Sequence, residues 1–364
     1  MNPTSPSLAA DTKQEPVPER VRYVSTYTEL SRKVQAAGLL RRRYAYYWTK
    51  IITLVAMFAG IWVIFAFVGN SWFQLLLAAA LGIVLTQFGF LGHDSAHRQI
   101  FASHRWNDWT SRVVSGVFMG LSHGWWTSKH SRHHANPNKE GRDPDVGAGV
   151  FAFTPSAARA RRGLPARLTP RQGYYFFPLL LLEGLALHVA SVQTLIQRRD
   201  LKHRWWEAAM LTGRLGGYVA VLLIVLPPGK AAAFFGVQMG LFGLILGAAF
   251  APNHIGMPIV PGTMKIDFLQ RQVLMSRNIR GGWLTSLAMG GLNYQIEHHL
   301  FPSMPRPSLR KAQRMVKDHC AKHKISYTET GLFEAYRTIV RYLNTVEFSA
   351  IDPFRCPLAS QYRN

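Results

Sequence analysis

The sequence predicts an all-α membrane protein with four transmembrane helices in two hairpins and a helical cap on the cytoplasmic side. Three observations lead to this fold class. Apolar residues make up 48% of the 364 residues, and they gather in uncharged blocks that charged stretches separate. Four blocks have about 20 residues, the length of a helix that crosses the hydrocarbon core. Short linkers join these four blocks in pairs.

The first pair comprises residues 51–68 and 72–92, which contain no charged side chain. The linker "GNSW" leaves room only for a tight turn between the two helices. The preceding stretch "RRRYAYYWTK" is basic and aromatic, as is typical of the cytoplasmic membrane interface. We therefore expect the N-terminus and the segment after residue 92 to lie on the cytoplasmic side.

Three apolar blocks follow, at residues 174–196, 206–226 and 231–251, and "PPGK" separates the last two. If all three blocks crossed the membrane, the histidines after residue 251 would lie on the opposite side from the earlier ones. A site shared by all these histidines requires an even number of crossings. The last two blocks then form the second hairpin, and block 174–196 lies at the interface or enters the bilayer only partly. Within residues 98–131, the short apolar stretch "RVVSGVFMGLSHGWW" is predicted to form an interfacial or core helix rather than a span.

Composition limits the remaining organisation. We predict a disordered tail at residues 1–25, a membrane domain with its cap at 26–320, and a cytoplasmic helical tail at 321–364. A net charge of +23 is compatible with nucleic acid, an anionic membrane or an acidic partner. The uncharged spans argue against nucleic acid. The two cysteines, Cys320 and Cys356, are too few for a disulfide framework or a cysteine zinc site, and we expect free thiols.

Eight of the 14 histidines fall in four groups, each just after a predicted span or in the cap. Three groups are the motifs "HDSAH", "HSRHH" and "QIEHH", and the fourth is a histidine in "PNHIG". Spacings of three or four residues place two imidazoles on one helix face, close enough to share a metal ion. The residues concerned are His93, His97, His130, His133, His134, His254, His298 and His299.

Each motif by itself has an ordinary explanation, since a pair of histidines four residues apart is more often a surface accident than a ligand set. The remaining histidines are not expected to be ligands. His104 is expected on the surface, and the single residues His123, His188 and His203 are expected to be structural or interfacial. His319 and His323 are four residues apart, but they lie in a Lys-rich helix and are expected on a solvated face.

The combination is more specific than its parts, because three motifs and His254 lie on one predicted side of the membrane. Imidazole nitrogens suit Fe, Zn, Cu or Ni rather than Mg or Ca. A structural zinc site needs four ligands and usually includes cysteine, so eight or nine ligands indicate two metals. Adjacent histidines point about 100° apart on a helix, so His133 and His134 are predicted to contact different metals.

These motifs resemble the three histidine boxes, HxxxH, HxxHH and [H/Q]xxHH, of the integral-membrane fatty acid desaturases. The resemblance covers roughly residues 40–320, and "HHANPNKEGRDPDV" and "NYQIEHHLFPSMPR" look like the acyl-chain branch of that family. Gln295, in place of the first histidine of the third box, is similar to front-end desaturases. Many of those carry a fused cytochrome b5 domain with an HPGG motif, which this sequence does not contain.

The resemblance implies a dinuclear site of two iron ions that uses O₂ and two electrons to insert a double bond into a long acyl chain. It implies the eight histidines as ligands, with Gln295 as a weaker ligand or an outer partner. Partners would be an acyl lipid or acyl thioester and a separate electron donor, a ferredoxin or cytochrome b5 with its reductase. Candidates for orienting the ligands are Asp94, Asp143, Asp145, Asn253 and Glu297.

Two other functions stay open at this point. A membrane di-iron hydroxylase of lipids would use the same ligands and place oxygen on the carbon. A histidine-rich metal transporter or sensor would need histidines inside the spans, whereas these groups lie outside the uncharged blocks. The basic surface would face either an acidic electron donor or anionic lipid headgroups. The sequence determines neither the position of the double bond nor the acyl carrier.

Overall fold

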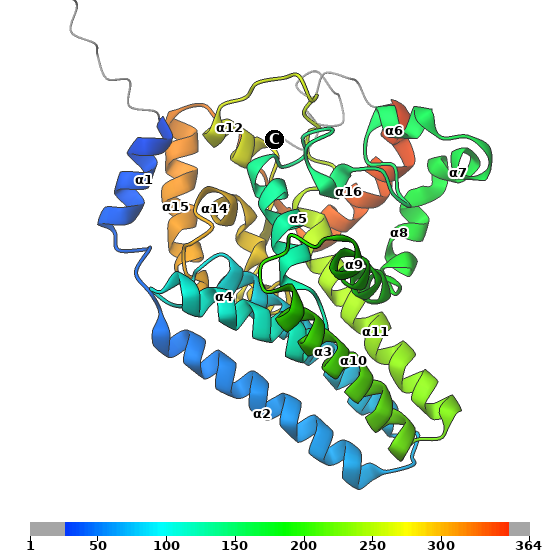
Figure 1. Cartoon of the computed structure of the whole chain (residues 1–364). Helices are drawn as coiled ribbons and strands as arrows, with labels where there is room; N and C mark the ends of the chain where they lie inside the picture. Colours follow the sequence, from blue (N-terminus) through cyan, green and yellow to red (C-terminus); the bar gives the residue numbers. More distant parts are fainter. Residues whose placement is uncertain (1–25, 349–364) are drawn as a thin grey trace, which may run out of the picture.

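A computed structural model describes residues 26–348 of the chain (Figure 1). The predicted tail at residues 1–25, Cys356 and the end of the predicted C-terminal tail lie outside the described residues. Nearly all described elements are helices; the exception is a short parallel pair of strands, β1 (Asn278–Arg280) and β2 (Glu329–Gly331). The predicted α-class is therefore correct except for this pair.

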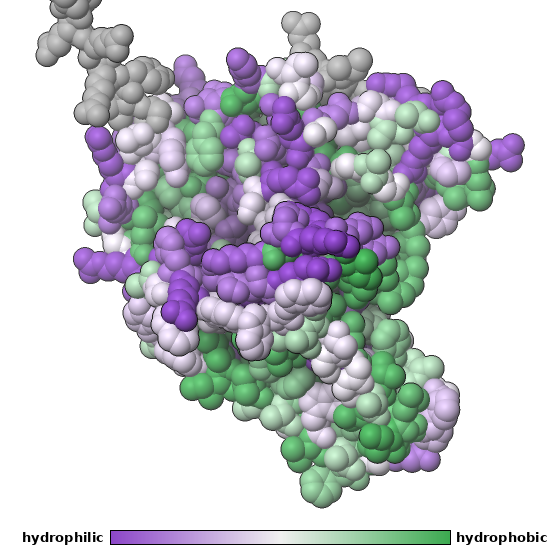
Figure 2. Space-filling model, in the orientation of Figure 1, coloured by the Kyte–Doolittle hydropathy of each residue, from purple (hydrophilic) through white to green (hydrophobic). Residues whose placement is uncertain are grey.

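Within the described residues, four helices are long and apolar enough to cross a membrane, as the sequence predicted. They are α2 (Tyr44–Val68), α3 (Gln74–Ala96), α10 (Arg204–Val225) and α11 (Pro228–Phe250). α2 carries exposed apolar side chains such as Phe67, 88% exposed, and α10 carries Ile224, 82% exposed. Figure 2 shows the hydrophobic residues gathered over the part of the molecule that these helices form, and hydrophilic residues over the opposite part. This distribution is that of a protein partly immersed in lipid.

α3 lies between α2 and α11 and packs against both. Small residues allow the close approach of α3 to α11: a Cβ at Gly82 would lie 2.9 Å from the carbonyl oxygen of Gln238. Close packing of small residues is a common way for helices to associate in lipid. α3 and α11 therefore run side by side toward the cap, and each of these two helices ends next to histidines.

The apolar block at residues 174–196 does not form one straight helix. It is divided into α8 (Gln172–Leu180) and α9 (Glu183–Gln197), and the chain bends by 82° between them. α9 touches α11 through two glycines, since a Cβ at Gly243 would lie 2.4 Å from the backbone nitrogen of Gly184. This geometry agrees with the expectation that the block does not cross as a simple span.

The helix predicted for the apolar stretch within residues 98–131 is interrupted, although, as predicted, the stretch is not among the helices that could cross a membrane. The segment forms α4 (His104–Val113), a π-helical turn η1 (Val114–Met119) and α5 (His123–Ala135). Gly120 ends the π-turn with a φ of 75°, a left-handed conformation that glycine adopts without steric cost. Ser122 then begins α5 by accepting a hydrogen bond from the backbone N–H of Trp125.

The cap consists of helices from both ends of the chain. α1 (Thr26–Ala36) and α12 (Phe268–Leu274) pack beside α14 (Gln295–Leu300) and α15 (Arg306–Lys322), and α16 (Leu332–Thr345) packs against α8. α15 continues across the predicted boundary at residue 320. The remaining short elements are η2 (Pro144–Val146), α6 (Pro155–Ala160), α7 (Gly163–Leu168), η3 (Thr169–Arg171), η4 (Ala251–Asn253), α13 (Trp283–Ala288), η5 (Leu292–Tyr294) and η6 (Val346–Phe348).

Candidate metal centre

The first histidine motif lies at the end of helix α3, directly after the apolar stretch of this helix. His93 lies in the last turn of α3 and is 3% exposed, and His97 follows the helix as its C-cap residue. Their rings meet edge to face with centroids 4.7 Å apart. The spacing of four residues therefore brings the two imidazoles together, as the sequence predicted.

Helix α5 carries the second motif, and a buried carboxylate holds the start of this helix. Glu207 of α10 accepts hydrogen bonds from the Ser122 hydroxyl at 2.7 Å and from the backbone N–H of Gly124 at 3.1 Å. A negative charge at a helix N-terminus is favourable, because the free N–H groups there carry partial positive charge. α10 thus fixes the position of the helix that carries His130, His133 and His134.

The third motif and His254 come from the far half of the chain. Gln295, His298 and His299 lie on α14 and are each no more than 2% exposed. His254 lies in the turn after α11, and the buried Arg277 holds this turn by donating to the carbonyl oxygens of residues 252 and 255. The fold therefore brings all eight predicted histidines into one region between α3, α5, α11 and α14.

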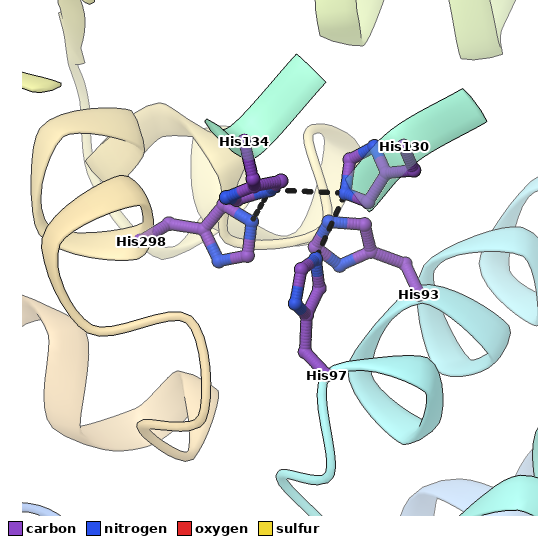
Figure 3. A group of neighbouring side chains, drawn as sticks. All are labelled: His93, His97, His130, His134 and His298. Atoms are coloured by element: carbon purple, nitrogen blue, oxygen red, sulfur yellow. Dashed lines mark hydrogen bonds between the residues drawn. The ribbon is translucent and has the colours of Figure 1, made fainter. Parts of the chain in front are cut away.

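Five of these histidines form a first group, shown in Figure 3: His93, His97, His130, His134 and His298. Three of the distances between their Nε2 atoms are 2.8 Å (His97 to His130), 3.0 Å (His130 to His134) and 3.1 Å (His134 to His298). Imidazole nitrogens bind first-row metals at about 2.1 Å, so two ligands at right angles on one ion lie about 3.0 Å apart. The spacing of the group therefore fits a single metal ion.

The second group consists of His133, His254 and His299. The Nε2 atoms of His133 and His254 lie 3.3 Å apart, and the Gln295 side-chain amide lies 2.9 Å from His254 Nε2. Asn253 donates to the Ala249 carbonyl oxygen, and its own side-chain oxygen is buried with no hydrogen-bond partner among the described residues. Adjacent histidines fall in different groups, as the 100° helical spacing predicts.

The outer ring nitrogens of the second group are anchored. His133 Nδ1 lies 3.0 Å from Asp143, His254 Nδ1 lies 3.0 Å from the Met275 carbonyl oxygen, and His299 Nδ1 lies 2.9 Å from the Gln272 side-chain oxygen. These acceptors place the ring proton on Nδ1 and leave the Nε2 lone pair facing inward. His93 Nε2 and His299 Nε2 are buried without a partner in the described structure, which suits nitrogens that await a cation.

The neutral state of most of these imidazoles also favours metal binding. Burial, and then the charge of neighbouring imidazoles, holds the pKa of five histidines well below the ordinary value: His97, His130, His134, His298 and His299. Burial lowers the pKa of His254 to about 3. Burial would also lower the pKa of His133, but the hydrogen bond to Asp143 and the charges of Asp145 and Asp143 outweigh it and raise that pKa. Neutral imidazoles keep a lone pair for a metal ion.

Of the carboxylates that the sequence offered as orienting residues, three lie beside histidines. Asp143 contacts His133, Asp145 lies 3.3 Å from the same ring, and Asp94 lies 3.6 Å from His93 Nδ1. Glu297 does not contact a histidine; it accepts hydrogen bonds from Asn278 and Tyr327 instead. The orientation of α14 turns its side chain away from both groups.

Sequence reasoning missed three outer contacts: the side chain of Gln272, the carbonyl oxygen of Met275, and Arg306. The Arg306 guanidinium is 2.6 Å from Asp94 and also donates to the Phe90 carbonyl oxygen. Gln272 and Met275 have no spacing signal relative to any histidine. Arg306 is visible in sequence only as one basic residue among several, so its burial could not be anticipated.

The histidines outside the two groups have varied surroundings. His104 is exposed, as expected, whereas His123 is buried beside Ser111 and His188 is buried between the Gly184 and Met119 carbonyl oxygens. The expectation of a solvated face for His319 is wrong, since this side chain is 3% exposed. The Lys-rich sequence around His319 concealed the face of α15 that packs against the cap.

A cavity of about 510 Å³ reaches the two histidine groups. Its walls are mostly apolar and come from α5, α8, α9, α11 and the loop around residues 146–153. His130, His133, His254 and Gln295 line one part of it, whereas Trp126, Phe176, Leu180, Leu246, Phe250 and Ile259 line the remainder. A long apolar molecule could therefore lie in contact with residues of both groups.

The sequence is similar to those of known fatty acid desaturases. A sequence model described as fatty acid desaturase matches residues 70–331. Fatty acid desaturase 3 of Bos taurus is 31% identical over 92% of this chain and 76% of its own length. Delta(6)-fatty-acid desaturase fat-3 of Caenorhabditis elegans is 29% identical over 91% of this chain and 76% of its own length. Acyl-lipid (9-3)-desaturase of Physcomitrium patens is 28% identical over 93% and 65%, respectively.

Proposed function

The chain belongs to the fatty acid desaturase family and is an oxygen-dependent membrane fatty acyl desaturase, and from this premise we propose that its two histidine groups hold a di-iron centre. His93, His97, His130, His134 and His298 would hold one ion. His133, His254 and His299, with Gln295 as a further ligand or outer partner, would hold the other. The observation that carries this proposal is the spacing of facing Nε2 atoms, 2.8 to 3.3 Å.

Two bound iron ions would supply the redox chemistry: O₂, two electrons and two protons are consumed, two neighbouring CH₂ groups each lose one hydrogen, and two water molecules form. The chain's own residues hold the ligands in place. Asp143, Gln272 and the Met275 carbonyl oxygen fix the orientation of the second group through its Nδ1 atoms. A rotation of the Gln295 amide by 180° presents either its oxygen or its nitrogen to this group.

The apolar cavity is the proposed place of the acyl chain. Phe176, Leu180 and Phe250 supply walls that exclude water, and His130, His133 and His254 line the part nearest the proposed metal ions. An acyl chain that lies along these walls would bring one C–C bond next to the ligand groups and hold it there for the reaction. The cavity walls therefore determine which bond is oxidised.

We further propose that α2 with α3, and α10 with α11, form two transmembrane hairpins with the cap on the cytoplasmic side. The basic stretch at residues 41–43, before α2, supports this orientation. The first histidines lie at the end of α3 and His254 follows the end of α11, so an even number of crossings places them on one side. Addition of a glycosylation acceptor to the short linker 69–73 tests the orientation.

A separate electron donor, a ferredoxin or a cytochrome b5 with its reductase, completes the proposal. The net charge of +23 supports an acidic protein partner, because opposite charges raise the rate of association. Anionic lipid headgroups are the alternative occupants of the same basic surface. The rate at which the donor reduces this protein can be measured in detergent at low and at high salt. A strong decrease of that rate at high salt would favour the protein partner.

Expression in a host without polyunsaturated lipids, followed by mass spectrometry of its fatty acids, tests the function. We expect a new double bond that disappears in His133→Ala and persists in the control His104→Ala, because His104 is exposed and outside both groups. Iron analysis of the purified protein should give two ions per chain. A hydroxylated product would indicate the di-iron hydroxylase instead, and one exchangeable zinc or nickel ion in place of iron would contradict the di-iron centre.

A further inference from the structure

A third cluster of possible metal ligands lies where α1 meets the end of α15, away from the two histidine groups. It consists of Glu29 on α1 and of His319 and His323 at the end of α15. The ligand atoms of these three residues all lie within 4.8 Å of one another, and the two imidazole rings have centroids 4.4 Å apart. Histidines four residues apart on one helix face are a common pair of metal ligands.

The ring nitrogens of this cluster have no partner that explains their burial. Both His319 nitrogens and His323 Nε2 are buried without a hydrogen bond to any described residue. The His319 side chain is only 3% exposed. An unsatisfied buried polar group costs about 1–3 kcal/mol, so its presence calls for a partner. Glu29 Oε2 lies 3.7 Å from His323 Nε2, which is too long for a hydrogen bond.

Glu29 divides its two oxygens between different neighbours. Oε1 receives the ammonium groups of Lys33 and Lys322, each at 2.9 Å, whereas Oε2 faces the imidazoles. The lysine side chains are 54% and 59% exposed. Exposed ion pairs contribute little, about 0–1 kcal/mol, so the lysines can turn into solvent when a cation approaches Oε2. Their positive charges nevertheless weaken the binding of any metal ion here, a property that a substitution can measure.

We propose that Glu29, His319 and His323 form a binding site for a divalent transition metal, best suited to Zn²⁺. Two imidazoles and one carboxylate, with water in the fourth position, are a ligand set that zinc accepts in tetrahedral geometry. The site lacks the five-imidazole arrangement of the first histidine group and lies outside the cavity. It therefore binds metal independently of the proposed di-iron centre.

The site joins two parts of the cap that are distant in sequence. α1 packs on α15, and α15 begins only five residues, 301–305, after α14, the helix of the third histidine motif. Arg306, at the start of α15, is paired with Asp94 beside His93. A metal ion at the other end of α15 would hold α1 against the helix and stabilise the folded cap by mass action.

Equilibrium dialysis of the iron-loaded, full-length protein in detergent at micromolar free Zn²⁺ tests the site. We expect uptake of one zinc ion per chain with no release of iron. Glu29→Gln should weaken zinc binding by more than the roughly tenfold that loss of an outer partner causes, since it removes a ligand. This substitution is at a partly exposed surface position and keeps the size of the side chain, so the protein should fold.

A second variant makes the assignment specific. Lys33→Gln combined with Lys322→Gln removes two positive charges but no ligand, so zinc should bind more tightly than in the unsubstituted protein. His104→Gln, an exposed histidine elsewhere, should bind zinc unchanged. No uptake of zinc by the unsubstituted protein, or equal affinity in Glu29→Gln, would overturn the proposal. Zinc uptake accompanied by an equal loss of iron would also overturn it, because the ion would then occupy the histidine groups.

Discussion

Asp143→Asn should selectively weaken the second histidine group. The Asp143 carboxylate is 2% exposed and accepts hydrogen bonds from three groups: His133 Nδ1 at 3.0 Å, the Asn138 backbone N–H at 2.7 Å and the Asp145 backbone N–H at 2.9 Å. An asparagine keeps the shape but replaces one oxygen by an NH₂ donor. In either orientation of the amide, one of these donors then faces another donor.

The structure sets the size of the effect. A hydrogen bond to a charged acceptor contributes about 1.5–3 kcal/mol, and loss of a partner that orients a metal-bound histidine costs about 10–100-fold in metal affinity. A tenfold change corresponds to about 1.4 kcal/mol, so the two estimates agree. The first group has no contact with Asp143 and should keep its ion, so iron content should fall from two ions per chain toward one.

Iron content at limiting free iron, together with product formation, measures this prediction. Asp200→Asn is the matched control, since Asp200 is exposed and, among the described residues, forms an ion pair only with Arg198. Asp145→Asn should have a smaller effect than Asp143→Asn, because Asp145 is 41% exposed and solvent can replace its contact with His133. If Asp143→Asn retained both iron ions and full activity, the inferred role of this carboxylate in orienting His133 would be refuted.

Three further predictions concern packing and reactivity. Gly243→Ala should destabilise the protein by about 1–3 kcal/mol and lower activity, because its Cβ would lie within 2.6 Å of the α8 and α9 backbone. The control is Gly236→Ala on the same helix, whose Cβ meets nothing within 4 Å. In thermal unfolding, this control should be neutral or stabilising. Burial raises the pKa of the Cys320 thiol to about 12. In a Cys356→Ser background, alkylation of Cys320 at pH 8 should therefore be roughly a thousandfold slower than that of a free thiol, and its rate should increase as the pH rises. Fast alkylation of the folded protein would contradict this prediction. Arg306→Met should lower the free energy of unfolding by about 3–5 kcal/mol, because it leaves the carboxylate of Asp94 on α3 buried without its partner. The iron content should fall together with the stability. Unchanged thermal unfolding would show that this ion pair contributes little.

The spans and the histidine groups were predictable because their signals are local. An uncharged run of about 20 residues identifies a membrane helix without knowledge of its neighbours. A spacing of four residues likewise brings His93 and His97 together on any helix. The sequence also placed adjacent His133 and His134 in different groups, which follows from the angle between neighbouring residues and requires no tertiary information.

The features that sequence reasoning missed depend on contacts between distant segments. Gln272 anchors His299, and Arg306 reaches Asp94 from more than 200 residues away; no periodicity relates these positions. The burial of His319 depends on the face of α15 that α1 covers, and its Lys-rich neighbours suggested the opposite. The break at Gly120 was missed because the apolar sequence continues through it, while the backbone does not.

The two histidine groups are unequal for a topological reason. α5 and α14 each present an adjacent pair, and each pair contributes one ring to each group. α3 contributes both its histidines to the first group alone, whereas the turn after α11 supplies only His254 to the second. The second group is therefore poorer in imidazole; the Gln295 amide lies beside His254, and the Asn253 amide lies next to that of Gln295. Because Gln295, His133 and His254 also line the cavity, an acyl chain in the proposed position would have more contact with the second group than with the first, from which His130 lines the cavity. Substitution of Gln295 by histidine should then increase metal affinity of the second group and change the position of the new double bond, whereas equal loss of both ions would show that the two groups do not bind metal independently.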